Sequence, residues 1–151
     1  MAAAVAIALS LRRLPSMTES TLLHELVASS AERTPEAPAL VDGAGAWSYA
    51  QLHSRMAAFA SGLRALGLCR AERVGIYLEK RFETVVASFG AAAAGAVVVP
   101  INPVLKPEQV AFIAGDCQVR VLITSPERLL QLLPTLSGLP DLHHVVLTDG
   151  T

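Results

Sequence analysis

The sequence has few cysteines and almost no net charge. Its two cysteines, Cys69 and Cys117, are too far apart for a zinc site or a redox pair. We therefore expect a reducing, cytoplasmic location, with both thiols packed as small core residues. Acidic and basic residues are scattered along the chain and sum to a net charge of −1, so charge predicts neither a nucleic-acid partner nor an anionic membrane surface.

The sequence also lacks the motifs of several enzyme classes. No Walker loop, nucleophile elbow or HExxH motif is present. His24 and His53 fall on expected helices without an acidic or thiol partner at ligand spacing. His143 and His144 are adjacent in an expected strand, so their side chains should point to opposite faces. We expect all four histidines to be structural and predict no metal site.

One stretch, residues 84–105, contains no charged residue and reads TVVASFGAAAAGAVVVPINPVL. Its length suits a membrane span, but its alanines add little to insertion and Asn102 with two prolines opposes it. Gly95 follows a helical pattern, and a valine-rich run closed by proline follows Gly95. We expect a helix, a tight turn and a strand covered on both faces, as in a parallel sheet, and no membrane span.

Apolar strands alternate with helical patterns over most of the chain. The expected strands are residues 73–78, 96–101, 119–124 and 142–148. This alternation predicts an α/β fold with a doubly wound, mostly parallel sheet flanked by helices. Between the strands, Pro107 opens a helix that Gly115 should close, and Ser125 should cap another helix that begins with Pro126.

An amphipathic helix carrying Leu22, Leu23, Leu26 and Val27 is expected to end near Pro35, before the strand PALVD. A turn, DGAG, then leads to AWSY. Gly43 and Gly45 in this region have the spacing that begins a dinucleotide fingerprint, but the third glycine is missing. A hairpin turn is favoured over a dinucleotide site, which a titration with NAD(H) would test.

The residues after this turn predict a capped helix. Ser48 and Gln51 have the spacing of a capping box, with Trp47 and Leu52 placed as the hydrophobic staple. The helix should begin directly after Ser48, bury one apolar face and end at Gly67.

The best-placed candidates for a site follow two expected strands. Glu79, Lys80 and Arg81 stand at the carboxyl end of one strand, and Asn102 and Lys106 follow the next. Open α/β sheets bind their ligands at this edge. A solvated helix N-terminus is nevertheless the favoured interpretation, and we assign no catalytic, cofactor-binding or metal-binding residue.

Taken together, WSYAQL, the helix end GLRALGL and AAAAGAVVVPIN resemble the amino-terminal region of the adenylate-forming, acyl-CoA synthetase superfamily. The resemblance covers residues 21–149. YLEKRFETVVA, NPVLKPEQV and DCQVRVLITS are particularly similar to AMP-forming acyl-CoA ligases found with exosortase A systems. It implies a partial doubly wound domain, namely the first part of the family's large amino-terminal domain.

The resemblance also implies a two-step reaction. A carboxylate attacks the α-phosphate of Mg-ATP to give an acyl-adenylate, and the thiol of coenzyme A then displaces AMP. The cofactors of the full-length enzyme would be ATP, Mg²⁺ and coenzyme A, and its substrate a carboxylic acid. No residue of this chain matches the family's phosphate loop or catalytic lysine, so we expect none of these ligands to bind tightly to it.

We therefore expect residues 17–151 to be an incomplete AMP-binding domain that is inactive alone, exposes apolar surface and has the rest of the ligase as its partner. Residues 1–16 are expected to be a disordered tail or the product of an upstream start, because their charges follow the apolar run. The alternative is a free-standing α/β binding or interaction module without catalysis.

Overall fold

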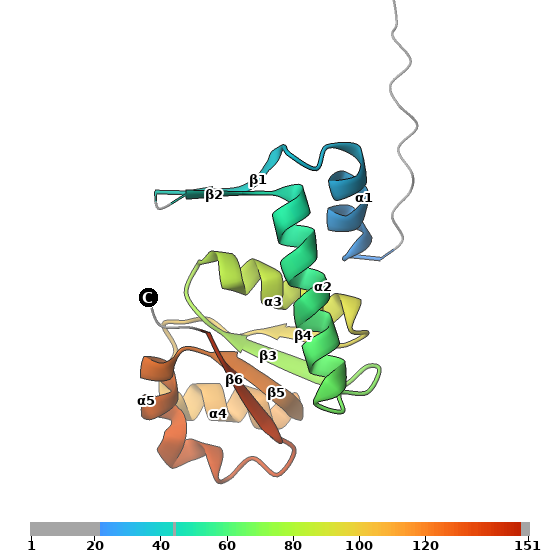
Figure 1. Cartoon of the computed structure of the whole chain (residues 1–151). Helices are drawn as coiled ribbons and strands as arrows, with labels where there is room; N and C mark the ends of the chain where they lie inside the picture. Colours follow the sequence, from blue (N-terminus) through green and yellow to red (C-terminus); the bar gives the residue numbers. More distant parts are fainter. Residues whose placement is uncertain (1–21, 44, 149–151) are drawn as a thin grey trace, which may run out of the picture.

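The computed structural model of the chain describes residues 22–43 and 45–148, so the expected tail 1–16 lies outside the described residues. An amino-terminal helix and hairpin precede four parallel strands and their crossovers (Figure 1). The elements in order are α1 (Glu25–Arg33), β1 (Pro38–Asp42), β2 (Gly45–Ser48), α2 (Tyr49–Ala65), β3 (Arg73–Tyr77), α3 (Phe82–Ala93), β4 (Val97–Pro100), α4 (Pro107–Asp116), β5 (Val119–Thr124), α5 (Pro126–Leu136) and β6 (His144–Leu147).

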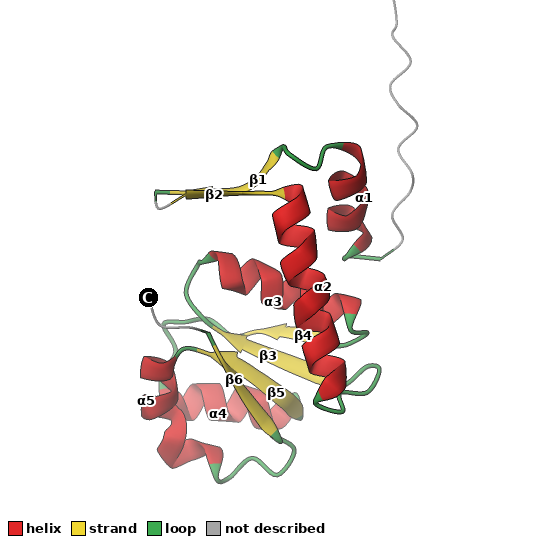
Figure 2. Cartoon of the chain, viewed as in Figure 1, coloured by secondary structure: helices red, strands yellow, loops and turns green. Residues whose placement is uncertain are grey.

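The four later strands form one parallel sheet in the order β4-β3-β5-β6. Helices α2 and α3 pack on one face, and α4 and α5 on the other (Figure 2). The strand order reverses direction after β4, as in doubly wound sheets. The predicted fold class is therefore confirmed.

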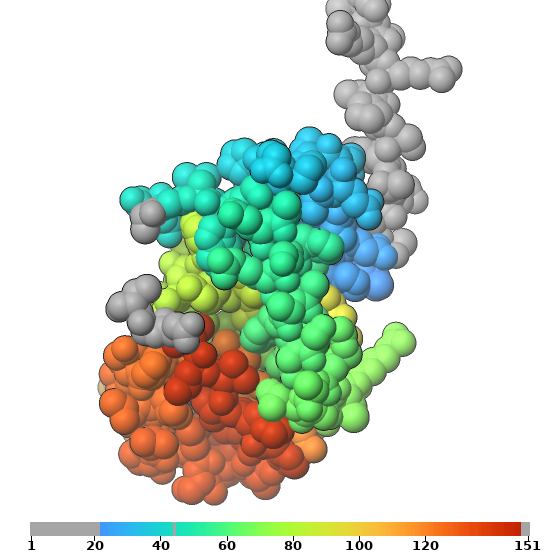
Figure 3. All heavy atoms as spheres, viewed as in Figure 1, coloured from blue at the N-terminus to red at the C-terminus, as the bar shows by residue number. Residues whose placement is uncertain are grey.

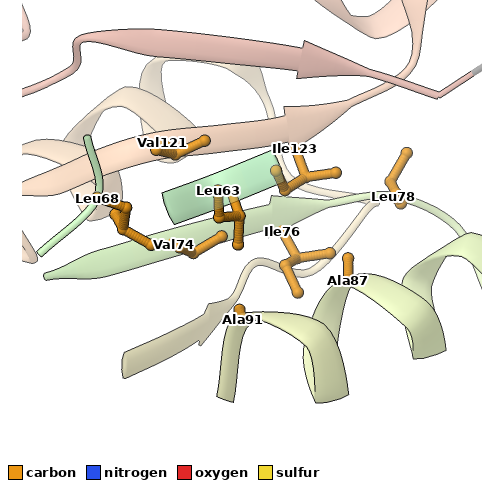
Figure 4. Packing of buried hydrophobic residues seen from close by; sticks show 9 residues of the cluster. All are labelled: Leu63, Leu68, Val74, Ile76, Leu78, Ala87, Ala91, Val121 and Ile123. Atoms are coloured by element: carbon orange, nitrogen blue, oxygen red, sulfur yellow. The ribbon is translucent and has the colours of Figure 1, made fainter. Parts of the chain in front are cut away.

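Two apolar clusters hold these layers together. On the α2–α3 face, Leu63 and Ala91 meet Val74, Ile76 and other strand residues (Figure 4). The opposite face buries a second cluster, made of Tyr77, Ile101, Val110, Leu122 and Leu132. Strands β3 and β5 contribute to both clusters because they are the central strands, with side chains that alternate between the faces.

The uncharged stretch 84–105 contains the predicted helix, turn and strand. Gly95 makes the turn at φ +86°, and Val98 and Val99 pack against the clusters on opposite faces. The strand nevertheless lies at the edge of the sheet, and Val97 is 48% exposed. Because Val97 and Ile101 donate toward β3, the missing N–H of Pro100 faces the open side, where proline is tolerated. In the described ranges, no helix is long and apolar enough to cross a membrane.

Two predictions about small residues were wrong. Gly115 does not close its helix, because α4 continues through Asp116 and Gln118 makes the reversal at φ 50°. Arg73 holds that reversal by donating to the carbonyl and side-chain oxygens of Gln118. The cysteines are not core residues: Cys69 is exposed in the loop after α2, and Cys117 is half-buried at the end of α4.

The amino-terminal elements lie beyond the α2–α3 side of the sheet (Figure 3). β1 and β2 pair antiparallel, so DGAG is part of a hairpin, as predicted. The capping box is present: Ser48 Oγ accepts from the Gln51 amide at 3.3 Å, and Gln51 Oε1 accepts from the Ser48 amide at 2.9 Å. The first helix begins later than predicted, at Glu25, and buries Val27.

Candidate functional site

A pocket of about 520 Å³ lies at the carboxyl edge of the parallel sheet. It is open to solvent, and its walls come from the ends of β3 and β5, the β4–α4 loop and the first turn of α5. In Figure 1 this edge faces the side where α5 is drawn. The charged residues of its lining are Glu79, Arg81, Lys106, Glu127 and Arg128.

Arg128 is the most highly connected side chain of this lining. Its Nε donates to Glu79 Oε1 at 2.7 Å, its Nη2 donates to the same oxygen, and its Nη1 donates to the carbonyl of Pro103 at 2.8 Å. The guanidinium also lies over the ring of Tyr77, 4.5 Å from the ring centroid. Three connections at the edge of the sheet therefore meet at one side chain.

The helix that carries Arg128 is placed by its own cap. Ser125 is buried and accepts through its hydroxyl from the Arg128 amide at 3.4 Å, while Pro126 fills the first helical position. A fixed φ and a satisfied amide both favour a helix start at this point. The sequence SPER thus sets the depth at which Arg128 enters the pocket.

Hydrogen bonds set the charge balance of the site. The hydrogen bond from Arg128 holds the pKa of the Glu79 carboxyl below its ordinary value, and the same pair raises the pKa of Arg128. Backbone and Ser125 hydrogen bonds at the start of α5 lower the pKa of Glu127. Both carboxylates are therefore ionised at neutral pH, and the guanidinium is positive.

The sequence-based candidates are only partly brought together. Glu79, Arg81 and Lys106 line the pocket, whereas Lys80 and Asn102 are not part of its lining. Asn102 has a local role, since its Oδ1 accepts from the Val104 amide at 3.1 Å. Arg81 donates to Glu83 at 2.8 Å.

Sequence reasoning missed Arg128 and Tyr77. A signal for Arg128 was present, because it lies in the first helical turn after β5, whose carboxyl end shares this edge with β3. Tyr77 reads in the sequence as an ordinary core residue. Only its hydroxyl, which donates to the Leu105 carbonyl at 2.8 Å, shows its place in the pocket wall.

The histidines lie elsewhere in the molecule. His24 precedes α1 and His53 is half-buried on α2. His143 lies just before β6, where its Nε2 is 2.6 Å from Arg120 Nη1, and His144 begins β6. Over residues 22–43 and 45–148, no group of three or more His, Cys, Asp or Glu side chains could hold a metal ion.

The pocket is suited to binding and positioning. Arg128 already has Glu79 and the Pro103 carbonyl as partners, whereas the charged groups of Lys106 and Arg81 lie in the lining beside them. Fixed cations at a strand edge attract anionic groups without transferring a proton. The geometry thus favours recognition over acid–base chemistry.

Comparisons with known proteins identify the relatives of this chain. The sequence profile described as "AMP-binding enzyme" matches residues 27–151. A linear gramicidin synthase from Brevibacillus parabrevis is 37% identical over 117 residues, which are 78% of this chain and 2% of that protein. L-proline--[L-prolyl-carrier protein] ligase of Pseudomonas fluorescens is 34% identical over 128 residues, 85% of this chain and 25% of that protein.

A solved structure gives the same result for the fold. The anthranilate CoA ligase AuaEII in complex with anthranoyl-AMP superposes with a TM-score of 0.78 at 29% sequence identity. The match covers 84% of this chain and 25% of that one. The chain therefore spans at most a quarter of the length of each of these three relatives.

Proposed function

Because the chain belongs to the family of AMP-binding enzymes, we propose that it is the amino-terminal part of a ligase that joins a carboxylate to AMP and then passes the acyl group to coenzyme A. The family match over residues 27–151 is the observation that carries this proposal. Its substrates would be ATP with Mg²⁺, a carboxylic acid and coenzyme A, and the enzyme would act in the cytoplasm. The narrower similarity to exosortase A-associated ligases belongs to the same proposal.

The chemistry turns a poor electrophile into a reactive one. Attack of the carboxylate on the α-phosphate releases pyrophosphate and leaves a mixed anhydride with AMP, a good leaving group for the thiol. Cations and backbone amides must take up the phosphate charge during this step.

In this proposal the chain supplies framework and contributes no catalytic group. Its parallel sheet and the contact between α2 and α3 form a rigid support for the rest of the enzyme. The 151 residues alone are therefore expected not to adenylate a carboxylate. This role differs from that of a free-standing binding module, which would need no further polypeptide.

One observation favours a second candidate, activation of an amino acid for transfer to a carrier protein. The L-proline ligase from Pseudomonas fluorescens is 34% identical to this chain, against 29% for the anthranilate CoA ligase. Both candidates share the adenylation step and differ in the carboxylate and in the thiol that accepts the acyl group.

Pyrophosphate exchange tests the proposal. The 151-residue chain and a version extended along the reading frame downstream of Thr151 would each be incubated with ATP, labelled pyrophosphate and a panel of fatty, aryl and amino acids. We expect carboxylate-dependent exchange from the extended chain alone. Exchange catalysed by the 151 residues, or a frame that stops at Thr151, would contradict the proposal.

The acceptor is tested in a second step. Thioester formation from the preferred acid is compared with coenzyme A and with a phosphopantetheinylated carrier protein as the thiol. Transfer to coenzyme A supports the first candidate, and transfer to the carrier protein alone supports the second.

A further inference from the structure

The β4–α4 loop, residues 101–106, forms one wall of the pocket but makes few contacts of its own. Its tip, Val104, is 81% exposed. Inside the loop, Asn102 accepts two amide hydrogens, from Val104 through Oδ1 and from Leu105 through its carbonyl, each at 3.1 Å. Such a loop is expected to open locally at low free-energy cost unless other elements hold it.

Two side chains from other elements hold this loop. Arg128 of α5 donates to the Pro103 carbonyl, and Tyr77 of β3 donates to the Leu105 carbonyl, both at 2.8 Å. Tyr77 is 2% exposed and fixed by the sheet, and its ring lies under the Arg128 guanidinium.

The grip of Arg128 in turn depends on Glu79. The carboxylate takes two of the guanidinium N–H groups, which leaves the Nη1 side of the fork directed at the Pro103 carbonyl. A planar guanidinium can serve two partners in fixed directions, which an ammonium group cannot do. Glu79 itself is positioned by Thr84, whose hydroxyl donates to the Glu79 carbonyl at 2.7 Å.

We propose that Arg128 is a positioning residue that, with Glu79 and Tyr77, holds the β4–α4 loop in place as the pocket wall. Lys106 follows directly after the held carbonyl of Leu105 and is the cap residue of α4, so its place at the pocket depends on this clip. The order of one crossover connection is thereby controlled by an ion pair between two others. The inference concerns the pocket wall and holds whichever reaction the complete enzyme performs.

Amide hydrogen exchange of the 151-residue chain, followed residue by residue by NMR, tests this inference. The amides of Val104, Leu105 and Lys106 report on the loop, because each donates within it or to the Gln109 side chain. In Arg128→Met and in Glu79→Ala we expect these amides to exchange roughly 5- to 10-fold faster. Amides of β3 and β5 should exchange at the rate of the unmodified chain.

Arg81→Met provides the matched control. Arg81 also pairs with a glutamate at this edge, but its partner Glu83 is two residues away and its side chain holds no loop carbonyl. We expect no change in loop exchange for this variant. The proposal is overturned if loop exchange is unchanged in Arg128→Met and Glu79→Ala, if β3 and β5 accelerate equally, or if Arg81→Met gives the same increase. Should Arg128→Met fail to fold, Glu79→Ala carries the test alone.

Discussion

At the scale of single residues, the start of α2 is fixed by two reciprocal hydrogen bonds. The hydroxyl of Ser48 and the side chain of Gln51 satisfy two amides that the helix cannot satisfy itself. Trp47, just before the cap, packs edge-on against Phe82 at 4.8 Å and lies under Arg55. The cap therefore sets where the hairpin ends as well as where the helix begins.

Removing the cap should lower stability. We expect Ser48→Ala to reduce the free energy of unfolding by about 1 kcal/mol, because the Gln51 amide loses its acceptor. Urea unfolding monitored by circular dichroism measures the change. Ser54→Ala, at an exposed position inside the same helix, is the control and should cost nothing. Equal losses in the two variants would argue against the capping role.

The ion pair of Glu79 predicts a pH dependence at the same scale. Arg128, and more weakly Arg81, lower the pKa of Glu79, while Glu127 is the nearby like charge. The folded pKa is below the unfolded one, so the stabilisation is fully present above the unfolded value and is lost as the pH falls through the folded value. Because the Glu79 side chain is 56% exposed, solvent screening limits the contribution to about 0.5–1 kcal/mol.

Comparison with Glu79→Gln tests this dependence. The variant should be less stable than the unmodified chain at pH 7, and the gap should close below the ordinary glutamate pKa. Chemical unfolding at pH 7 and again near pH 3 gives both values. A gap that is the same at the two pH values would show that the carboxylate charge is unimportant.

At the scale of elements, the closest contact is between α2 and α3. Gly90 of α3 faces α2 so closely that a Cβ atom there would lie 2.7 Å from Phe59 Cδ1 and 3.1 Å from the Met56 carbonyl oxygen. The alanines that follow in α3 let the helix lie close on the sheet, and Ala87 and Ala91 are buried. Small residues on α3 thus determine how near the two helices approach.

A pair of glycine substitutions separates packing from helix propensity. Gly90→Ala should destabilise the chain by roughly 1–3 kcal/mol, because the added methyl group overlaps Phe59 and backbone. Gly62→Ala, in α2 with nothing within 4 Å of the added atom, should stabilise it by about 0.5–1 kcal/mol. Thermal or urea unfolding measures both. A stabilising Gly90→Ala would mean that the two helices are free to move apart.

At the scale of the whole molecule, several large apolar side chains remain on the surface. Phe112 of α4 and Leu130 of α5 are 72% and 71% exposed, and Leu22, Leu23 and Leu26 are each more than half exposed. The expected exposure of apolar surface is therefore seen among the described residues. In the proposed function, part of this surface would be covered by the remainder of the enzyme.

Polar substitutions on this surface should be tolerated. We expect Phe112→Gln combined with Leu130→Gln to weaken the fluorescence of a bound hydrophobic dye, while unfolding free energy changes by less than about 0.5 kcal/mol. Dye binding and urea unfolding are measured on the same samples. The buried neighbour Leu132, changed to Ala, should instead cost about 2–5 kcal/mol. A large loss in the double variant would show that these side chains contribute to packing.

The sequence by itself determined the elements, because their signals are local. The cap at Ser48, the turn at Gly95 and the proline after Ser125 each act within a few residues, and alternating strands and helices imply a parallel sheet. It also indicated the edge at which Glu79, Arg81 and Lys106 meet. The end of α4 was missed, since Gln118 is held in its turn by Arg73, a contact across 45 residues.

Only the tertiary structure decided the strand order and the pocket wall. That β4 lies at an edge depends on which crossover covers which strand, a long-range choice that a valine run does not encode. The clip of Arg128 with Glu79 joins residues 49 positions apart, and its third partner is a backbone carbonyl that carries no sequence signal. Hydrogen bonds to such groups exist only once packing has brought the connections together, which is why the pocket's central residue became visible only in the folded chain.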